Sequence, residues 1–566
     1  MRLKQFCRVF LLRFGVTKTL GAACLALWSS VARAAPEPWS DADPAEPAKR
    51  YAFEGKVGEK FGVTAGVEYR AQATSITPLT LSSNVDSKAF WIEHRGRVDA
   101  ALDYDEAIRL TTSIDILDSV LWGDNGTLGK APEADSGANV NARNVNVSRI
   151  CTVYGSGPEY DASSYRYGLC PADPLYVRRL YADVVTPIGL FRIGRQPTTV
   201  GSTVALNDAD GRTNRFGVAY RGNQVDRILF ATKPLEAFKP KDKQNLSEHE
   251  GLIVATGYDH VVNDSVVSHS DNVHQWFTAL LFMAPKYRFG RDLEARLFHS
   301  YRWDAKNSSS IHALGGRLTS RVGNFYAGFD TALFFGTTRE VSAAYAVISN
   351  DPVVDQRVLE FGARAVVRYD QPAWSLYLEG DYASGESDPS NRAPLTQFRF
   401  SEDTNVGLLM FKQVLAYQTA RAAAAGVALL KNLQAPTIPI EAIASRGSFT
   451  GAAALFPQID VRPIDNLFLR GGVLFARAPQ GVVDPIQSQQ RKKGSLTVQE
   501  ANVNFAGGAP GSYYGTEIDL RAQYRFKKHF IADLEGAVLF PGGSLEDENG
   551  RAVRSVLVQG RTTVFF

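Results

Sequence analysis

The stretch from Gly515 to Phe526, GTEIDLRAQYRF, alternates between apolar and polar side chains. The apolar set ends in aromatic residues and the polar set is mostly charged: Thr516, Ile518, Leu520, Ala522, Tyr524 and Phe526 against Glu517, Asp519, Arg521, Gln523 and Arg525. A period of two predicts a β-strand with two unlike faces. A strand that crosses a bilayer needs roughly 9–11 residues, so this stretch is long enough to span a membrane with its apolar face toward lipid.

The C-terminal end of the chain repeats this alternation and stops on an aromatic residue. One face carries Val556, Val558, Gly560, Thr562, Val564 and Phe566, and the other carries Gln559, Arg561 and Thr563. A terminal aromatic on such a strand resembles the assembly signal of bacterial outer-membrane barrels, in which the last strand closes on the first. We predict that the barrel assembly machinery recognises Phe566 as part of this signal. The alternative is a soluble protein that ends in two phenylalanines by chance.

The N-terminus has the features of an export signal. Basic residues precede an apolar run from Leu20 to Trp28, and Ala32-Arg33-Ala34 follows as an A-x-A cleavage site. We predict a signal peptide over residues 1–34 and a periplasmic lead-in over residues 35–57, with an unstructured Pro-rich and acidic first part. Cleavage removes six basic and no acidic residues, which leaves 56 basic and 59 acidic side chains. This balance gives no reason to expect a nucleic-acid partner.

Only two cysteines remain after the predicted cleavage. Cys151 and Cys170 lie in a Gly-, Asn- and Ser-rich stretch, and an even pair in an exported protein predicts a disulfide. Metal binding by two isolated cysteines is the less favoured interpretation. The predicted bond would join two parts of one long loop, residues 123–174.

The rest of the chain predicts an all-β, transmembrane, antiparallel up-and-down β-barrel over residues 58–566. No run of eighteen apolar residues follows the leader, which excludes membrane-spanning helices. Nineteen segments have strand character, and a barrel with both ends in the periplasm needs an even number, so we predict 18 strands. When strands are counted inward from each end of the chain, the alternation of up and down strands fails between Val225 and Asn272. Either one segment in this interval is a loop, or a strand elsewhere in the chain, near Tyr51–Val57, has been missed. The predicted strands lie near 61–70, 90–104, 108–116, 176–186, 189–196, 214–221, 225–233, 251–258, 274–284, 292–303, 311–321, 323–336, 356–370, 373–384, 447–456, 464–477, 513–526, 529–540 and 554–566.

Short turns alternate with long loops, as expected for periplasmic turns and extracellular loops. The loops predicted to be external are 123–174, 197–213, 385–446 and 478–512. Within the third loop, residues 406–433 are rich in Ala and Leu and predict a helix. This helix either caps the barrel mouth or folds into the pore as a lid or constriction.

The polar faces of the predicted strands carry many arginines and carboxylates. Such charges either pair across strands and fill the lumen, or line a conduit that attracts carboxylate groups and releases them again. A barrel of about eighteen strands leaves an aqueous channel, which favours the conduit. The predicted pore-lining residues are Arg95, Arg97, Arg109, Arg192, Arg364, Arg368, Glu379, Asp381, Glu517, Asp519, Arg521 and Arg525.

The sequence carries no recognisable catalytic, nucleotide-binding or metal-binding motif. The histidines are scattered, and a segment similar to a calcium loop, Asn207 to Gly211, lacks the downstream carboxylate. We therefore predict no enzymatic activity, no cofactor and no metal. A barrel hydrolase built from a Ser and a His brought together in space stays open as an alternative.

Several stretches together resemble the alginate export family of outer-membrane porins. They are Ser512–Leu520, Tyr524–Phe526, Gly536–Gly542, Gly189–Gln196, Asp210–Phe216 and Glu379–Pro389, which spread over most of residues 61–566. The resemblance implies an eighteen-stranded monomer that passes an exopolysaccharide through an arginine-lined pore gated by loops. The long cysteine-containing loop and the Ala-rich helix depart from the family pattern, and alginate itself is not indicated.

We therefore predict an integral protein of the Gram-negative outer membrane that exports a secreted polysaccharide. Its other predicted partners are outer-membrane lipid and lipopolysaccharide, the barrel assembly machinery and a periplasmic polysaccharide export complex. The first alternative is an uptake porin for small anions or sugars. The second is a barrel enzyme or a surface structural protein.

Overall fold

The computed structural model describes residues 53–57, 60–82, 88–105, 107–123, 150–153, 166–169, 175–199, 204–206, 211, 213–219, 224–245, 247, 250–263, 273–305, 308–432, 443–492, 497, 500–527 and 529–566. These residues form one 19-stranded sheet and a separate two-stranded sheet. The strands are β1 (Phe53–Val57), β2 (Phe61–Thr77), β3 (Ala89–Tyr104), β4 (Ile108–Gly123), β5 (Ile150–Val153), β6 (Arg166–Leu169), β7 (Leu175–Thr186), β8 (Gly189–Pro197), β9 (Gln224–Thr232), β10 (Gly251–Asn263), β11 (His274–Tyr287), β12 (Gly290–Asp304), β13 (Ser309–Val322), β14 (Phe325–Thr338), β15 (Gln356–Asp370), β16 (Trp374–Ala383), β17 (Ala452–Ile464), β18 (Leu467–Arg477), β19 (Tyr513–Phe526), β20 (Phe530–Pro541) and β21 (Ser555–Phe565).

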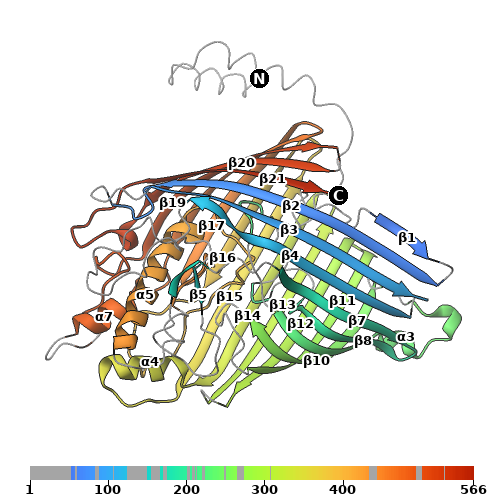
Figure 1. Ribbon diagram of the computed structural model, residues 1–566, viewed down its shortest axis with the longest axis horizontal. Helices are drawn as coiled ribbons and strands as arrows, with labels where there is room; N and C mark the ends of the chain where they lie inside the picture. Colours follow the sequence, from blue (N-terminus) through green and yellow to red (C-terminus); the bar gives the residue numbers. More distant parts are fainter. Residues whose placement is uncertain are drawn as a thin grey trace, which may run out of the picture.

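The large sheet closes into a barrel because β2 pairs antiparallel with both β3 and β21 (Figure 1). The closing register runs from Glu68 opposite Phe565 to Thr77 opposite Val556. Without β1, which lies outside the ring, the 19-stranded sheet leaves 18 barrel strands. The predicted antiparallel up-and-down barrel of 18 strands is confirmed.

Two details of the predicted strand order are wrong. Segment 214–221 is not a strand, because its described residues form only an isolated bridge between Thr213 and Val218. It belongs to the connection between β8 and β9. It lies just before the interval from Val225 to Asn272, in which the alternation of up and down strands was expected to fail. β1 occupies the segment suspected near Tyr51–Val57, but it extends β2 beyond the end of β21 rather than entering the ring.

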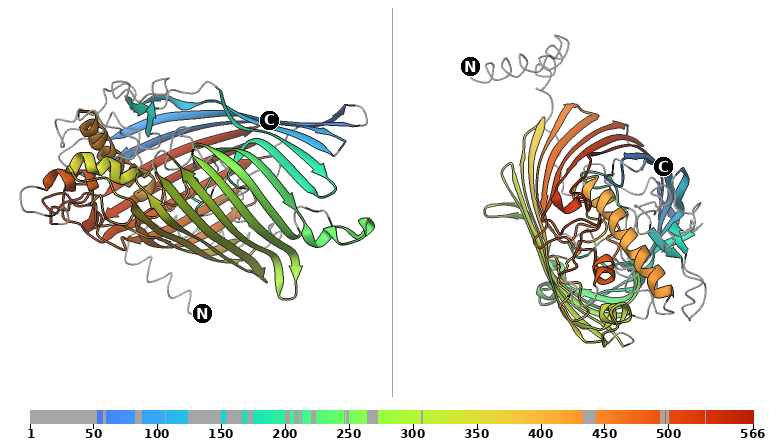
Figure 2. Two further views of the ribbon diagram at one scale, coloured as in Figure 1. Left: turned by 90° about the horizontal axis from the view of Figure 1, so that it is seen from below. Right: turned by 90° about the vertical axis from the view of Figure 1, so that its left-hand side faces the viewer.

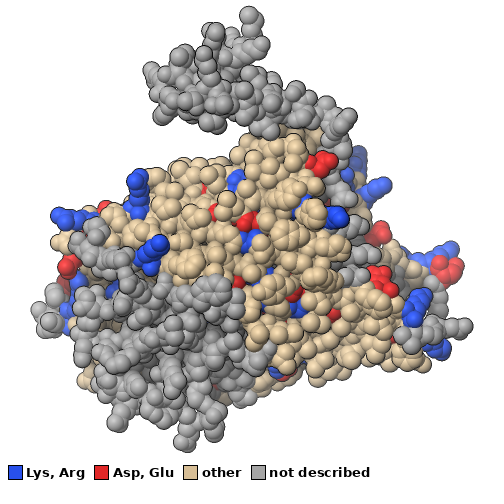
Figure 3. Space-filling view, turned by 45° about the horizontal axis from the view of Figure 1, so that its top comes forward, with Lys and Arg blue, Asp and Glu red and all other residues tan. Residues whose placement is uncertain are grey.

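The barrel wall has the two faces that the alternation predicts. Leu520 is 62% exposed on the outside, whereas its neighbour Asp519 is fully buried on the inside. The outer wall between the two ends is largely uncharged (Figure 3). Rings of Tyr258, His274, Trp303, Tyr301 and His312 stack on the outer face, and such belts occur where barrels meet the membrane interface.

The two ends of the barrel differ, and we call them the loop end and the turn end. The loop end carries α4 (Glu340–Ser349), the π-helix η5 (Met410–Leu415), α5 (Ala416–Asn432), α7 (Pro485–Arg491) and the short η6 (Gly543–Leu545), whereas the turn end carries α3 (Pro234–Ala237) and η4 (Lys241–Lys243) (Figure 1). The helix predicted over 406–433 is confirmed as η5 and α5. The sequence did not predict α4 or α7. Within the described residues, no helix is both long enough and apolar enough to cross a membrane.

The connection between β4 and β7 contains the predicted disulfide. β5 and β6 form a hairpin there in which Cys151 lies opposite Gly168. Cys170 and the calcium-like segment 207–210 lie outside the described residues, as do the signal peptide and most of the lead-in. The disulfide between Cys151 and Cys170 and the signal peptide therefore stay predictions.

A hydrophobic core fills part of the barrel at the loop end. Phe398, Phe400, Phe411 and Phe449 are each at most 1% exposed, and they form a chain of ring contacts 4.7–6.0 Å apart. Phe398 lies so close to the wall at Gly362 that a side chain there would collide with its ring. The loop that joins β16 to β17 therefore packs inside the barrel, and Figure 2 shows α5 across its mouth.

Candidate permeation pathway

All twelve residues predicted to line the pore lie on the inward face of their strands, because their neighbours face outward. Most of them are nevertheless buried: Arg95, Arg97, Arg368, Glu379, Asp381, Glu517, Asp519 and Arg521 are each at most 5% exposed. Arg109, Arg192, Arg364 and Arg525 are more accessible. The pore-lining role of these twelve residues stays a prediction, because the position of a side chain on the inner wall does not show that it contacts a passing solute.

Many of these charges pair with one another across strands. Arg97 and Arg178 both contact Asp115, at 2.6 Å each, and Arg364 contacts Glu379 at 2.8 Å and Asp381 at 2.6 Å. Buried charges need such partners, because an unpaired ion inside a protein is costly. The first interpretation of the polar faces, cross-strand pairing, is therefore correct for much of the wall.

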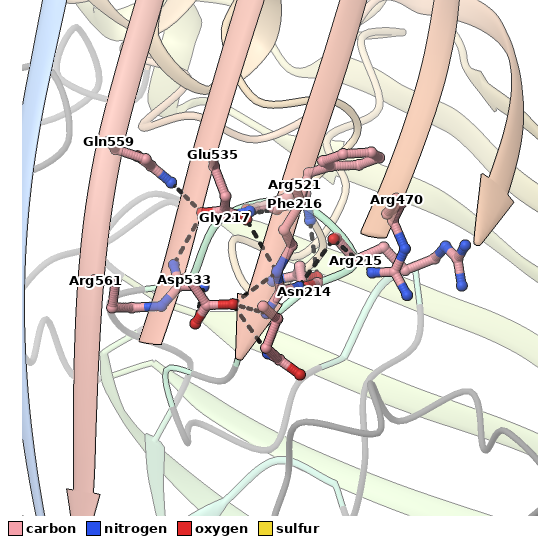
Figure 4. Close-up of polar contacts among 12 residues, drawn as sticks. Asn214, Arg215, Phe216, Gly217, Arg470, Arg521, Asp533, Glu535, Gln559 and Arg561 are labelled. Carbon is pink, nitrogen blue, oxygen red and sulfur yellow. Dashed lines mark hydrogen bonds and ion pairs between the residues drawn. The ribbon is translucent and has the colours of Figure 1, made fainter. Parts of the chain in front are cut away.

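A loop that crosses the lumen explains much of this burial. We call the described residues between β8 and β9, namely 198, 199, 204–206, 211 and 213–219, the constriction loop. Its main chain is held by wall arginines (Figure 4): Arg521 donates to the carbonyl oxygens of Asn214 and Arg215, at 2.9 and 3.0 Å. Arg470 donates to the same Arg215 oxygen at 2.6 Å. The predicted external loop 197–213 belongs to this connection, and its described residues Val204 and Gly211 also contact inward side chains of the wall. Its position outside the membrane stays a prediction.

The constriction loop reaches several sides of the barrel. The carbonyl of Gly211 accepts hydrogen bonds from Arg70 and Arg95, on β2 and β3, at 3.0 and 3.3 Å. On the other side, the amide of Val204 donates to Asp330 on β14 at 3.1 Å. One loop thus ties together strands that are far apart around the ring.

Arg215 anchors the tip of the constriction loop through its own side chain. It donates to Gln458 at 2.7 Å, lies 3.0 Å from Asp460, and stacks 3.8 Å from the ring centroid of Tyr377. The amide of Gly217 donates to Glu535 at 2.9 Å. Gly217 has a φ of +70°, a left-handed conformation that glycine adopts without strain. These contacts hold the loop against β16–β20.

Glu517 holds a second segment inside the barrel, residues 403–415, which we call the η5 segment. Its carboxylate accepts hydrogen bonds from the amides of Leu408, Leu409 and Met410 at 2.5–2.7 Å, where η5 begins. Amides at a helix start have no partner within the helix, and a carboxylate both satisfies them and complements the helix dipole. Gly407 has a φ of +72° and lies so close that a Cβ would be 2.9 Å from Glu517 Oε1. Glu517 therefore anchors a loop helix rather than lining open space.

The two inserted segments also bind each other. Asn405 donates from its side chain to the carbonyl of Phe216 at 3.2 Å, and Asn214 donates to the carbonyl of Asp403 at 2.9 Å. Lys412 lies in η5, and burial lowers its pKa to about 8. The constriction loop and the η5 segment therefore form one packed unit against the wall.

Sequence reasoning missed this unit because loop position is a tertiary property. Segment 214–221 has alternating residues, which suggested a strand, but the hydrogen bonds described above join it to residues 189 to 318 positions away. The glycines Gly211, Gly217 and Gly407, all with positive φ, are local signals of tight loops in these segments. Among the described residues, no cluster of three His, Cys, Asp or Glu side chains is suited to hold a metal ion.

Residues 170–559, more than half of the chain, match the family described as Alginate export. The chain belongs to the Alginate export family. It is accordingly an integral outer-membrane β-barrel, and this family and fold are those of a channel rather than an enzyme. No curated protein matches the chain significantly.

Several solved structures are similar to this member of the Alginate export family over most of its length. Acinetobacter baumannii OccAB3 has a TM-score of 0.47 at 8% identity, with 89% of this chain and 99% of that chain covered. Pseudomonas aeruginosa OccK8 (OprE) has a TM-score of 0.44 at 10% identity, with 89% and 98% covered. Pseudomonas aeruginosa OpdK, solved with vanillate, has a TM-score of 0.43 at 10% identity and the same coverage.

Proposed function

We propose that the protein is a passive outer-membrane conduit that exports a secreted polysaccharide, with its loop end at the cell surface. Membership of the Alginate export family is the single observation that carries this proposal. The absence of a nucleotide-binding motif from the sequence agrees with a passive step. A periplasmic export complex would deliver the polymer to the turn end, and the channel would work as a monomer.

The charge pattern of the inner wall supports an anionic polymer. Arginines alternate with carboxylates, so a uronate group would meet guanidinium groups that already have partners and would be held weakly. Weak binding at many sites is what conduction requires, because a tightly held solute does not leave. Passage of a polymer would require the constriction loop and the η5 segment to make room.

An uptake porin for small anions or sugars is the second candidate function. It is favoured by the way the constriction loop is tied to the wall, because Arg521, Arg470 and Glu535 hold its main chain directly. A small solute could pass beside such a fixed loop without moving it.

Deletion of the gene tests the export function. Polysaccharide at the cell surface and in the spent medium would be measured in the deletion strain and its parent. We expect loss of one polymer, restored by the full-length gene but not by a version without Phe566. Unchanged polymer would refute export and make solute uptake the leading function.

Conductance separates the two candidates further. Purified barrel in a planar bilayer would be exposed to a small uronic acid or to anionic oligosaccharides of increasing length. An export conduit is expected to show blocks that lengthen with chain length, whereas a small-solute porin would ignore chains that are too wide to pass the constriction.

A further inference from the structure

The barrel closes along one seam, between β2 and β21. Gln72 on β2 and Arg561 on β21 lie opposite each other, although 489 positions separate them in the chain. The other neighbouring strands of the ring follow one another in chain order and are joined by a turn or a loop. Non-covalent contacts therefore set the position of β21 along β2.

The side-chain pattern does not fix this register completely. A slip by one residue would turn every inward side chain of β21 toward lipid, whereas a slip by two residues keeps both faces. Toward the loop end, such a slip runs out of strand, because β2 ends at Thr77, before Pro78. Toward the turn end, β2 continues to Phe61, so β21 could move by two residues and keep the same number of pairs. This second slip needs another obstacle.

β1 occupies the remaining edge of β2 at the turn end. Val67 and Phe566 exchange two main-chain hydrogen bonds of 2.8 Å each. The next hydrogen-bonding position along this edge, Ala65, pairs with Phe53 of β1. β1 therefore continues the line of β21 past Phe566, as Figure 1 shows. A slip of β21 by two residues would place Phe566 opposite Ala65, where Phe53 already lies.

The hydrogen-bond pattern indicates which amides of β1 face β2. In an antiparallel pair, alternate residues exchange main-chain hydrogen bonds with the partner strand. Val67 does so with Phe566, and Val63, four residues earlier on β2, therefore directs its main chain to the same edge. Gly55 lies opposite Val63, so its amide points into the ladder, whereas the amide of Lys56 points away from β2.

We propose that β1 is a register stop, which blocks the edge of β2 and so fixes the position at which β21 closes the barrel. Charge supports the same register, because the slip would set Arg561 opposite Arg70, and like charges directly opposite each other are destabilising. β1 adds a steric block to this preference. The register stop concerns closure of the barrel and does not rest on the identity of the transported solute.

The register matters for the pathway because the constriction loop is anchored on both sides of the seam. Arg70 on β2 holds the carbonyl of Gly211, whereas Arg521 on β19 holds the carbonyl of Arg215. A slip by two residues would move one group of anchors past the other by about 7 Å. β1 thereby keeps the two groups of anchors at positions that one loop can bridge.

Disulfide trapping tests the register directly. The full-length barrel would carry Thr562→Cys with either Ala71→Cys, at its partner in the structure, or Tyr69→Cys, at its partner after the slip. Cα atoms of such directly opposite residues lie about 5.5 Å apart, within disulfide range, whereas those of diagonal neighbours lie roughly 7–8 Å apart, outside it. Mass spectrometry of the cross-linked peptides separates these bonds from any at Cys151 or Cys170. With β1 intact, we expect the Ala71 pair to cross-link and the Tyr69 pair to stay reduced.

Two proline substitutions at adjacent positions separate the role of β1 from general damage. Gly55→Pro removes an amide that points into the ladder, whereas Lys56→Pro removes one that points away from it. Gly55→Pro should raise cross-linking of the Tyr69 pair at least about tenfold, and Lys56→Pro by less than about twofold. Folded protein would be selected by its heat-modifiable electrophoretic migration. No increase in folded Gly55→Pro protein, or equal increases in both variants, would overturn the register stop.

Deletion of residues 53–57 covers the case in which Gly55→Pro does not fold. It removes β1 altogether and should give the slipped cross-link, together with a changed single-channel conductance, because the anchors of the constriction loop are displaced. Closure of the deletion variant in the native register alone would refute the stop. Failure of both variants to close would also refute it, because β1 would then be required for closure itself. Polymer export is measured separately, so either proposal can fail alone.

Discussion

Arg521 on β19 donates a hydrogen bond to the main-chain carbonyl of Arg215, 3.0 Å away and 306 positions earlier in the chain. The same Arg215 oxygen accepts a second hydrogen bond, from Arg470 on β18. Arginines of the wall thus hold the main chain of the constriction loop. The width of the pathway therefore depends on a small number of contacts that can be removed one at a time.

Arg521→Gln is expected to loosen the constriction loop. Hydrogen bonds to charged groups contribute roughly 1.5–3 kcal/mol each, so loss of the two to Asn214 and Arg215 should weaken docking by about 3–6 kcal/mol. Single-channel recordings should show higher conductance and more frequent current fluctuations. Arg525→Gln, inward-facing on the same strand and bonded to Gln523, is the matched control. Equal conductance of Arg521→Gln and wild type would contradict the anchoring role.

Glu517→Ala is expected to release the η5 segment from the wall. Three amides lose their acceptor, and each buried unsatisfied group costs about 1–3 kcal/mol. Limited trypsin digestion of the folded barrel should then cleave after Lys412 or Arg421, which the wild type protects. Glu517→Gln keeps an acceptor oxygen and should be intermediate. Identical digestion of wild type and Glu517→Ala would argue against this anchor.

Lys412 predicts a pH dependence of stability. Burial lowers its pKa from 10.5 to about 8, so the folded state binds fewer protons than the unfolded state between these values. Folding then becomes more favourable as pH rises through this window, and the cost of roughly 3 kcal/mol is fully present below pH 8. Lys412→Met should raise the unfolding temperature at pH 7. Its advantage over wild type should shrink toward pH 10.5, and a constant difference across the window would refute this origin.

Phe566 can be tested apart from the strand pairing that it completes. Its amide and carbonyl both bond to Val67, at 2.8 Å, while the residue is 64% exposed. Phe566→Ala keeps the main-chain bonds and removes only the ring, whereas deletion removes both. If the assembly machinery reads the ring, both variants should lower the amount of folded protein in the outer membrane. Normal amounts of Phe566→Ala would restrict the role of this residue to pairing.

The predicted disulfide has a direct chemical test. Protein isolated from the outer membrane would be denatured and alkylated with and without reductant, then measured by mass spectrometry. If Cys151 and Cys170 are bonded, they should take up alkyl groups only after reduction. Alkylation without reductant would refute the bond.

The amino-acid sequence by itself determined the barrel wall. In a strand, side chains alternate between faces, so residues such as Leu520 and Asp519 reveal which face meets lipid without any knowledge of the rest of the chain. The number of strands and the closing pair also follow, because every transmembrane strand must pair on both edges. The misassigned strand, 214–221, has the alternation of a strand, but its described residues pair with no strand of the sheet.

Only the tertiary structure decided what fills the barrel. Arg521 is recognisable in sequence as an inward-facing cation, but whether it meets a solute or the main chain at Arg215 depends on where a loop more than 300 residues away is placed. The same holds for Glu517, whose acceptors face the amides of Leu408–Met410 rather than water. Alternation is a property of neighbours along the chain, whereas loop docking and register depend on contacts between residues far apart in sequence.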